Sequence, residues 1–221
     1  MGELPRFFSS LATQVLATAV VMAMSTGAAL AADSVLLPPD ESVEGASQAI
    51  WSQRWWEWAG SFPYELSPVA DKTGDLCASN QSGEVWFLAG TYGTQRAIRT
   101  CHVPRDKYLF FPLINYLASA FEDRAGPCVD FMTSAAQLTR KPKALVLQVD
   151  GVRMEDLMAH RQASPACFDV GAKAFGSPRY RAAANGYYVM LRPLSPGRHT
   201  VEFGGALPTM YQAVTYTLII D

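Results

Sequence analysis

The side chains best suited to ligand chemistry are tryptophans, and four of the chain's five lie in residues 51–58. Tryptophan faces stack on ligand rings, but they also fill hydrophobic cores. At about 100° per residue, Trp51, Trp55 and Trp58 fall on one face of a helix, as core-facing residues do. Trp56 points to the opposite side. The spacing predicts three core tryptophans and leaves Trp56 as a candidate for ligand binding.

Arg54 lies in the same tryptophan-rich stretch, within the arc of the core-facing stripe. A long cationic side chain can pack its stem on apolar neighbours and keep its charged head in water. Glu57 follows three residues later, which is a neighbouring position on a helix surface. We therefore expect an ion pair between Arg54 and Glu57.

Carboxylates are the second group with possible chemistry. Glycoside hydrolysis needs two of them across the substrate, one with a raised pKa. The candidates are Glu57, Asp71, Glu84, Glu122 and Asp123, and the sequence does not choose among them. The adjacent acids Glu122 and Asp123, followed by Arg124, are typical of a solvated turn. The sequence therefore assigns no catalytic residue, and a polysaccharide hydrolase is the alternative hypothesis.

The three histidines, His102, His160 and His199, are far apart in the sequence. None has the spacing of a metal-ligand motif, so we expect no metal site, and no motif indicates a cofactor. His102 lies on a predicted strand next to a cysteine, where it could face a cleft. The candidate ligand-binding set is Trp56, Tyr92, His102, Tyr116 and Glu122.

The beginning of the chain resembles a secretory signal peptide. Arg6 precedes an apolar run over residues 11–24, and small residues lead to a cleavage pattern at Ala31 and Ala32. We expect a signal peptide over residues 1–32, one domain over residues 33–221, and a secreted or periplasmic protein with no membrane span after cleavage. The net charge is −2 without a basic run, so nothing indicates a nucleic-acid partner.

All four cysteines lie in the expected mature chain. An even number in an exported protein predicts disulfides, and four cysteines allow three connectivities. Cys77 and Cys101 bracket a predicted hairpin, which favours their pairing and leaves Cys128 with Cys167.

The remaining pattern is mainly β. Turn residues separate roughly seven short apolar runs, and Asp150-Gly151 is the strongest hairpin signal among them. The first expected elements are a helix over 42–60, a turn-rich segment over 64–83 with an Asx turn at Asp71, and a hairpin over 84–104. A buried strand follows near 107–117, in which Pro112 indicates a bulge or the end of regular pairing. The rest is expected to form a helix over 128–142, a hairpin over 143–154, a long loop or crossover over 158–185 and three final strands. We predict an antiparallel β-sandwich of the immunoglobulin-like or jelly-roll type, with an N-terminal Trp-rich helix and one further short helix.

Several stretches together resemble a family of uncharacterised exported bacterial proteins. They are "RWWEWAGSFP", "DKTGDLCASNQSGEVWFLAGTYG", "RTCHVPRDKYLFFPLIN" and "GYYVMLRPLSPGRHTVEFGG", with a core pattern VWFLAGT…C.VP…FFP. The resemblance covers nearly all of the mature chain and implies one domain with Cys77 and Cys101 as a pair. The pair Cys128 and Cys167 is less typical of that family, and the resemblance implies no activity.

A binding function follows best from these features. The predicted sandwich, the disulfides and the aromatic-polar candidate set indicate a non-catalytic exported module for a glycan or another envelope component. The hypothesis names a carbohydrate or an envelope protein as the partner.

Overall fold

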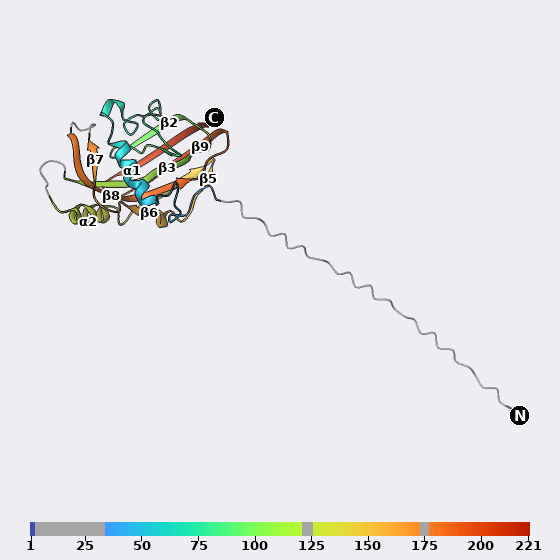
Figure 1. The fold of residues 1–221 in the computed structure, drawn as a ribbon. Helices are drawn as coiled ribbons and strands as arrows, with labels where there is room; N and C mark the ends of the chain where they lie inside the picture. Colours follow the sequence, from blue (N-terminus) through green and yellow to red (C-terminus); the bar gives the residue numbers. More distant parts are fainter. Residues whose placement is uncertain (3–33, 121–125, 173–176) are drawn as a thin grey trace. The chain divides into compact units, whose positions relative to one another are not determined.

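Two five-stranded sheets pack face to face in the computed structural model, which describes residues 1–2, 34–120, 126–172 and 177–221 (Figure 1). The first sheet has the order β1-β3-β8-β6, with β7 also paired to β8, and the second has the order β2-β10-β9-β4-β5. The strands are β1 (Val85–Phe87), β2 (Gln95–Val103), β3 (Tyr108–Ser119), β4 (Ala144–Val149), β5 (Val152–Arg153), β6 (Arg161–Ala163), β7 (Phe168–Ala172), β8 (Ser177–Leu191), β9 (Gly197–Ala206) and β10 (Tyr211–Ile220). The predicted signal peptide lies outside the described residues.

Both sheets are mixed, which corrects the prediction of purely antiparallel pairing. β1 runs parallel to β3, and β2 runs parallel to β10, while the other pairs are antiparallel. The predicted hairpin over residues 84–104 is therefore wrong, because β1 and β2 belong to different sheets. Val85 and Trp86 of β1 are both buried, whereas β2 alternates between buried and exposed side chains. β1, which is buried on both faces, fits the first sheet, because that sheet is covered by a helix on one face and by the second sheet on the other. β2, which has one exposed face, fits the second sheet, whose outer face is open to solvent.

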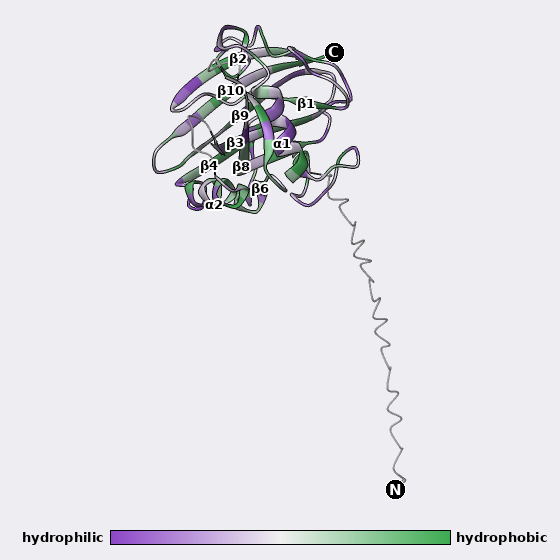
Figure 2. Ribbon diagram, turned by 60° about the vertical axis from the view of Figure 1, so that its left-hand side comes forward, coloured by the Kyte–Doolittle hydropathy of each residue, from purple (hydrophilic) through white to green (hydrophobic). Residues whose placement is uncertain are grey.

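The main hydrophobic core lies between the two sheets, and the hydropathy of its strands can be followed in Figure 2. In β10 the predicted alternation is confirmed, with Val214, Tyr216, Leu218 and Ile220 buried. The predicted bulge is also confirmed, because the register between β3 and β8 shifts between Pro112 and Ile114.

The shift frees two backbone carbonyls for a link between the sheets. Nε2 of the buried Gln212 donates to the carbonyl oxygens of Pro112 and Leu113 at 2.7 and 2.8 Å. Gln212 lies on β10 and its acceptors on β3, so this amide joins the two sheets across the core.

Helix α1 (Gln48–Ala59) covers the outer face of the first sheet (Figure 1). Trp51, Trp55 and Trp58 are buried against that face, as the spacing predicts. The helix begins at Gln48 rather than at 42, because Glu44 and Gly45 take positive φ values of 51° and 69° in a turn. Ser47 then caps the first turn by accepting a hydrogen bond from the Ile50 N–H.

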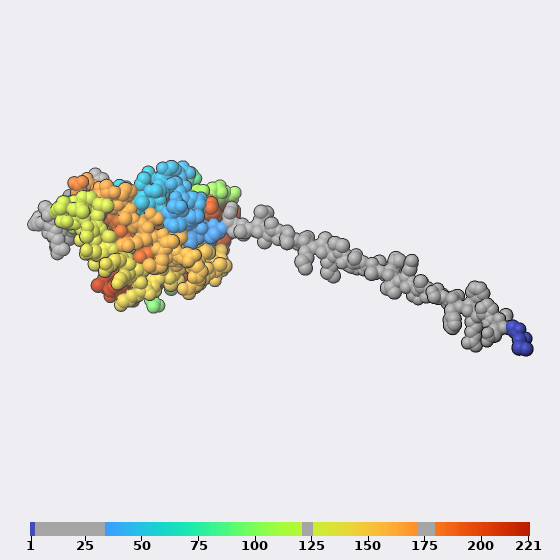
Figure 3. Space-filling view, turned by 90° about the horizontal axis from the view of Figure 1, so that it is seen from below, coloured from blue at the N-terminus to red at the C-terminus, as the bar shows by residue number. Residues whose placement is uncertain are grey.

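Helix α2 (Cys128–Leu138) confirms the second predicted helix and packs against β8 and β3. Figure 3 shows its surface in yellow-green, on a different part of the molecule from the blue segment that leads into α1. The expected loop over 158–185 instead contains a short 3-10 helix (Leu157–His160), β6, β7 and the first half of β8. β6 and β7 each pair with β8, and local residue patterns do not reveal this pairing.

The hairpin at Asp150-Gly151 is confirmed, with both residues at positive φ and β4 paired to β5. Both disulfides are present as expected, Cys77–Cys101 and Cys128–Cys167. Two disulfides indicate that the chain folds in an oxidising, extracytoplasmic compartment. Among the described residues, no helix is long and apolar enough to cross a membrane.

Candidate functional site

A hollow of about 450 Å³ lies between α1 and the segment that precedes β1. We call it the Arg54 pocket. It combines aromatic rings with polar side chains and is lined by Trp51, Arg54, Trp58, Ser61, Asn80, Ser82, Gly83 and Phe87. Among these lining residues there is no carboxylate, histidine or cysteine.

Hydrogen bonds from the indoles to backbone carbonyls hold the tryptophans of α1 in place. Trp51 donates to the Val43 carbonyl at 3.0 Å, and Trp58 donates to the Ser79 carbonyl at 2.9 Å. A buried indole N–H needs such a partner, and each bond also ties the helix to a neighbouring loop. Trp51 and Trp58, which form the apolar wall of the Arg54 pocket together with Phe87, are therefore rigidly placed.

Arg54 stacks on this wall instead of pairing with Glu57. Its guanidinium carbon lies 4.5 Å from the centroid of the Trp51 ring. The predicted ion pair is not formed, because Glu57 accepts a hydrogen bond of 2.9 Å from Gln53, one turn earlier on the helix. Cation–π attraction holds a guanidinium on an aromatic ring without using its N–H groups, which remain available as hydrogen-bond donors.

The opposite wall consists of turns before β1 whose shape depends on Gln81. Its amide donates to the carbonyls of Cys77 and Phe87 at 3.0 and 2.9 Å and accepts from the Phe87 N–H. Asn80 and Gly83 have φ values of 49° and 70°. Asparagine and glycine tolerate this left-handed conformation better than other residues do.

Two anchors fix this wall to the second sheet. The Cys77–Cys101 disulfide joins it to β2. Arg99, also on β2, has only 2% of its surface exposed. Its guanidinium donates to the Tyr216 hydroxyl and to the carbonyls of Val69, Asp71, Ala89 and Gly90.

The predicted Asx turn at Asp71 is confirmed. Its carboxylate accepts hydrogen bonds from the N–H groups of Thr73, Gly74 and Leu76 at 2.8 to 3.0 Å. Burial alone would raise the pKa of this carboxyl, but these bonds and the Thr73 hydroxyl together lower it. The Asp71 segment is therefore a structural turn, and Arg99 binds it by donating to the Asp71 backbone carbonyl.

Trp56, the sequence candidate on the other face of α1, is half-buried between two hydrophobic clusters. Its indole N–H donates to the Tyr188 hydroxyl at 2.9 Å, which also accepts from the Asn115 amide at 3.2 Å. Burial raises the pKa of Tyr188 well above its usual range, so this hydroxyl stays neutral. Trp56 thus links α1 to β8.

The other candidates lie at separate places. Tyr92 stacks on Tyr64 with centroids 6.0 Å apart, and burial raises the pKa of its hydroxyl. His102 is exposed on β2 with Nδ1 3.5 Å from the Asp221 carboxylate, and Tyr116 packs near α2. None of these three residues, nor Trp56, lines the Arg54 pocket. Glu122, with Asp123, lies outside the described residues.

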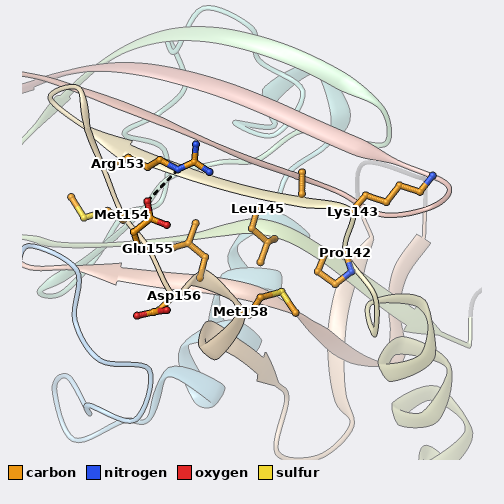
Figure 4. Close-up of a pocket in the computed structure, with 10 residues that line it drawn as sticks. Pro142, Lys143, Leu145, Arg153, Met154, Glu155, Asp156 and Met158 are labelled. Atoms are coloured by element: carbon orange, nitrogen blue, oxygen red, sulfur yellow. Dashed lines mark ion pairs between the residues drawn. The ribbon is translucent and has the colours of Figure 1, made fainter.

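Two further hollows lie on the second sheet. One, of about 380 Å³, lies beside the edge of β4 and β5, where Lys143 and the ion pair of Arg153 with Glu155 border Leu145 and Met158 (Figure 4). The other, of about 550 Å³, covers the outer face of β2, β10, β9 and β4. Its lining includes Phe203 and Tyr211 together with Arg96 and the carboxylate of Glu202, whereas no lining residue of the Arg54 pocket carries a carboxylate.

A contact chain of Asp150, His199 and Ser195 resembles a hydrolase triad in residue type only. Nδ1 of His199 lies 2.7 Å from Oδ2 of Asp150, while Nε2 lies 2.8 Å from the Ser195 carbonyl oxygen and 3.4 Å from its hydroxyl. An Nε2 that donates to a carbonyl carries a proton and cannot act as a base. The imidazole therefore acts as a clamp in the structural sense: its two hydrogen bonds join the turn at Asp150 to the turn at Ser195.

Replacing His199 with glutamine is expected to lower the free energy of unfolding by at most about 1 kcal/mol, since Asp150 is 47% exposed. Burial would lower the pKa of His199, but bonds to Asp150 and the Ser195 carbonyl raise it, so this stabilisation is lost as pH rises through the raised value. Burial would raise the pKa of Asp150, but bonds from His199 and Thr200 lower it, so stabilisation is lost as pH falls through the lowered value.

Denaturant unfolding of the unmodified protein and of His199→Gln should show the largest difference in the free energy of unfolding between about pH 3.8 and pH 6.5. A difference independent of pH would contradict the clamp.

Among the described residues, no group of three or more His, Cys, Asp or Glu could hold a metal ion. No family model matches the chain, and no curated protein matches it. A search of solved structures finds one described as "Structure of PbICP-C in complex with falcipain-2", with 10% sequence identity over 63% of this chain and 100% of that chain and a TM-score of 0.23. A likeness this weak carries no argument about this protein.

The sequence signal for the Arg54 pocket was present but incomplete. Arg54 and the tryptophans stood out by spacing, whereas Asn80 and Ser82 lie in a turn-rich segment without periodicity. Asn80 and Gly83 predict a turn. The sequence does not show which helix this turn faces, because the Cys77–Cys101 disulfide and Arg99 determine its position.

Proposed function

We propose that the protein is an exported, non-catalytic binding module for a glycan, and that the Arg54 pocket is its binding site. The observation that carries the proposal is the guanidinium of Arg54, 4.5 Å from the Trp51 ring centroid, in a hollow of about 450 Å³. Export is supported by the disulfides and by the signal-like beginning of the chain. We also propose the immunoglobulin-like or jelly-roll type for the sandwich, supported by its face-packed sheets.

The mixture of side chains in the Arg54 pocket fits a sugar. A pyranose presents apolar C–H faces and a rim of hydroxyls, and binding sites match them with apolar walls and a few placed polar groups. Trp58 and Phe87 supply the wall, while Asn80 and Ser82 supply polar groups that make no side-chain hydrogen bond to another described residue. The Ser61 hydroxyl donates to the Trp58 carbonyl and retains its acceptor positions.

The lining of the Arg54 pocket also supports binding without catalysis. Glycoside hydrolysis requires two carboxyl groups about 5 to 10 Å apart, and no lining residue carries one. The alternative, a polysaccharide hydrolase that uses two of Glu57, Glu122 and Asp123, remains a prediction. Of these acids, the described Glu57 faces Gln53 on the helix surface and does not line the pocket.

The test is binding to soluble polysaccharides by affinity electrophoresis, with the double variant Asn80→Gly and Ser82→Ala. Glycine suits the positive φ of residue 80, and both side chains are exposed, so stability should change little. Loss of two hydrogen-bonding groups should weaken binding about tenfold or more.

The matched control is Thr133→Ala with Ser134→Ala, two exposed polar residues on α2. It should migrate as the unmodified protein does in every gel. The proposal is wrong if no polysaccharide retards the protein, or if both double variants are retarded equally.

A further inference from the structure

Arg54 is a cation without an anionic partner in its own pocket. None of the ion pairs between described residues includes it. Glu57, the nearest acid along the helix face, is bound to Gln53 at 2.9 Å. None of the described residues that line the pocket carries a carboxylate, so none of them balances the charge of Arg54.

The stacked position of Arg54 leaves its strongest donors unused. Cation–π attraction to the Trp51 ring does not use the N–H groups of the guanidinium in a hydrogen bond. No side-chain hydrogen bond of Arg54 to a described residue is formed, in contrast to the five acceptors of the buried Arg99. A fork of parallel N–H donors matches a planar carboxylate, which can accept two bonds at once.

From this geometry we infer that the Arg54 pocket takes an acidic sugar, specifically a uronic acid whose carboxylate pairs with Arg54. The inference rests on the proposed glycan-binding function and narrows its ligand class. The ring of the uronic acid lies against Trp58 and Phe87, and its hydroxyls reach Asn80 and Ser82. Arg54 is then the residue that separates acidic from neutral glycans.

The experiment compares polysaccharides that share a backbone and differ in charge. Galacturonan, alginate and glucuronan are each used in the free-acid form and as the methyl ester, and affinity electrophoresis gives the dissociation constants. We expect at least one free acid to bind about tenfold or more tightly than its ester, and this preference to fall as ionic strength rises.

Arg54→Met should remove the preference for the acid, because methionine keeps an apolar stem on Trp51 but carries no charge. Arg54→Lys should retain part of it, since an ammonium is a point charge without the fork. Arg96→Met is the matched control, because Arg96 is an exposed arginine on β2, on the other sheet. Its binding should equal that of the unmodified protein.

The outcomes separate the two proposals. Equal binding of acids and esters, or of neutral glycans alone, overturns the acidic ligand and leaves glycan binding intact. An acid preference that survives in Arg54→Met overturns the assignment to this pocket. If none of these polysaccharides, nor a panel of neutral glucans, mannans and xylans, is bound, the proposed function fails and the inference with it.

Discussion

Replacing Arg99 with methionine is expected to lower the free energy of unfolding by about 3 to 5 kcal/mol. The guanidinium is almost wholly buried on β2 and reaches four backbone carbonyls and one hydroxyl. The guanidinium carbon also lies over the Tyr216 ring, 5.4 Å from the centroid. Methionine fills much of the volume but leaves the carbonyls of Val69, Asp71 and Gly90 without the donors of Arg99. The Tyr216 hydroxyl still accepts from the Ala89 N–H at 3.2 Å and donates to the Ala89 carbonyl at 3.4 Å. Each unpaired buried acceptor costs about 1 to 3 kcal/mol.

Chemical denaturation at neutral pH measures this loss. Arg96→Met, three residues earlier on the same strand, is the control, because that side chain is exposed and its loss should change stability by less than about 0.5 kcal/mol. Arg99→Lys should fall between the two, since one ammonium cannot reach all the acceptors that the Nε, Nη1 and Nη2 donors of the guanidinium reach. Equal stability of the two methionine variants would show that the carbonyls find other partners.

Removing the Cys77–Cys101 disulfide by a double substitution to alanine is expected to cost more than removing Cys128–Cys167. The sequence separations are 24 and 39 residues, so loop entropy alone predicts about 3.5 and about 4 kcal/mol, the opposite order. Cys77 and Cys101 lie in the main core, where the alanines also leave a cavity. Cys128 and Cys167 are half-buried at the edge of α2, where the chain can relax.

Thermal and denaturant unfolding of the two double variants decides the order. The Cys77 and Cys101 variant should also lose glycan binding, because the disulfide fixes the wall that carries Asn80 and Ser82. The Cys128 and Cys167 variant is the control and should bind as the unmodified protein does. A greater loss of stability in this control would mean that loop entropy outweighs packing in this fold.

Arg99 and the Cys77–Cys101 disulfide serve the same segment. Residues 61–83 have little regular structure, with one short 3-10 helix at Tyr64–Leu66. Loops of this kind order only when side chains or covalent links compensate the entropy that they lose. β2 supplies both links, so the second sheet determines the shape of a pocket that lies on the outer side of the first.

Several features were predictable from the sequence because their causes are local. The positions of Trp51, Trp55 and Trp58 follow from helical periodicity, and the hairpin at Asp150-Gly151 follows from backbone preferences of two residues. The alternation in β10 marks one buried face. The disulfide pairs were also predicted, although the argument for Cys77–Cys101 assumed a hairpin that is absent and succeeded through nearness in sequence.

Other features depend on contacts between distant segments, and no local pattern determines them. β1 and β2 are neighbours in sequence but enter different sheets, because β1 has two faces to bury and β2 has one. Arg54 and Glu57 were expected to form an ion pair. In the structure Arg54 lies over the Trp51 ring instead, and Glu57 accepts a hydrogen bond from Gln53. The tryptophan stretch by itself thus determined a core helix, while the folded chain brought Asn80 and Ser82 together with Arg54 in the lining of one pocket.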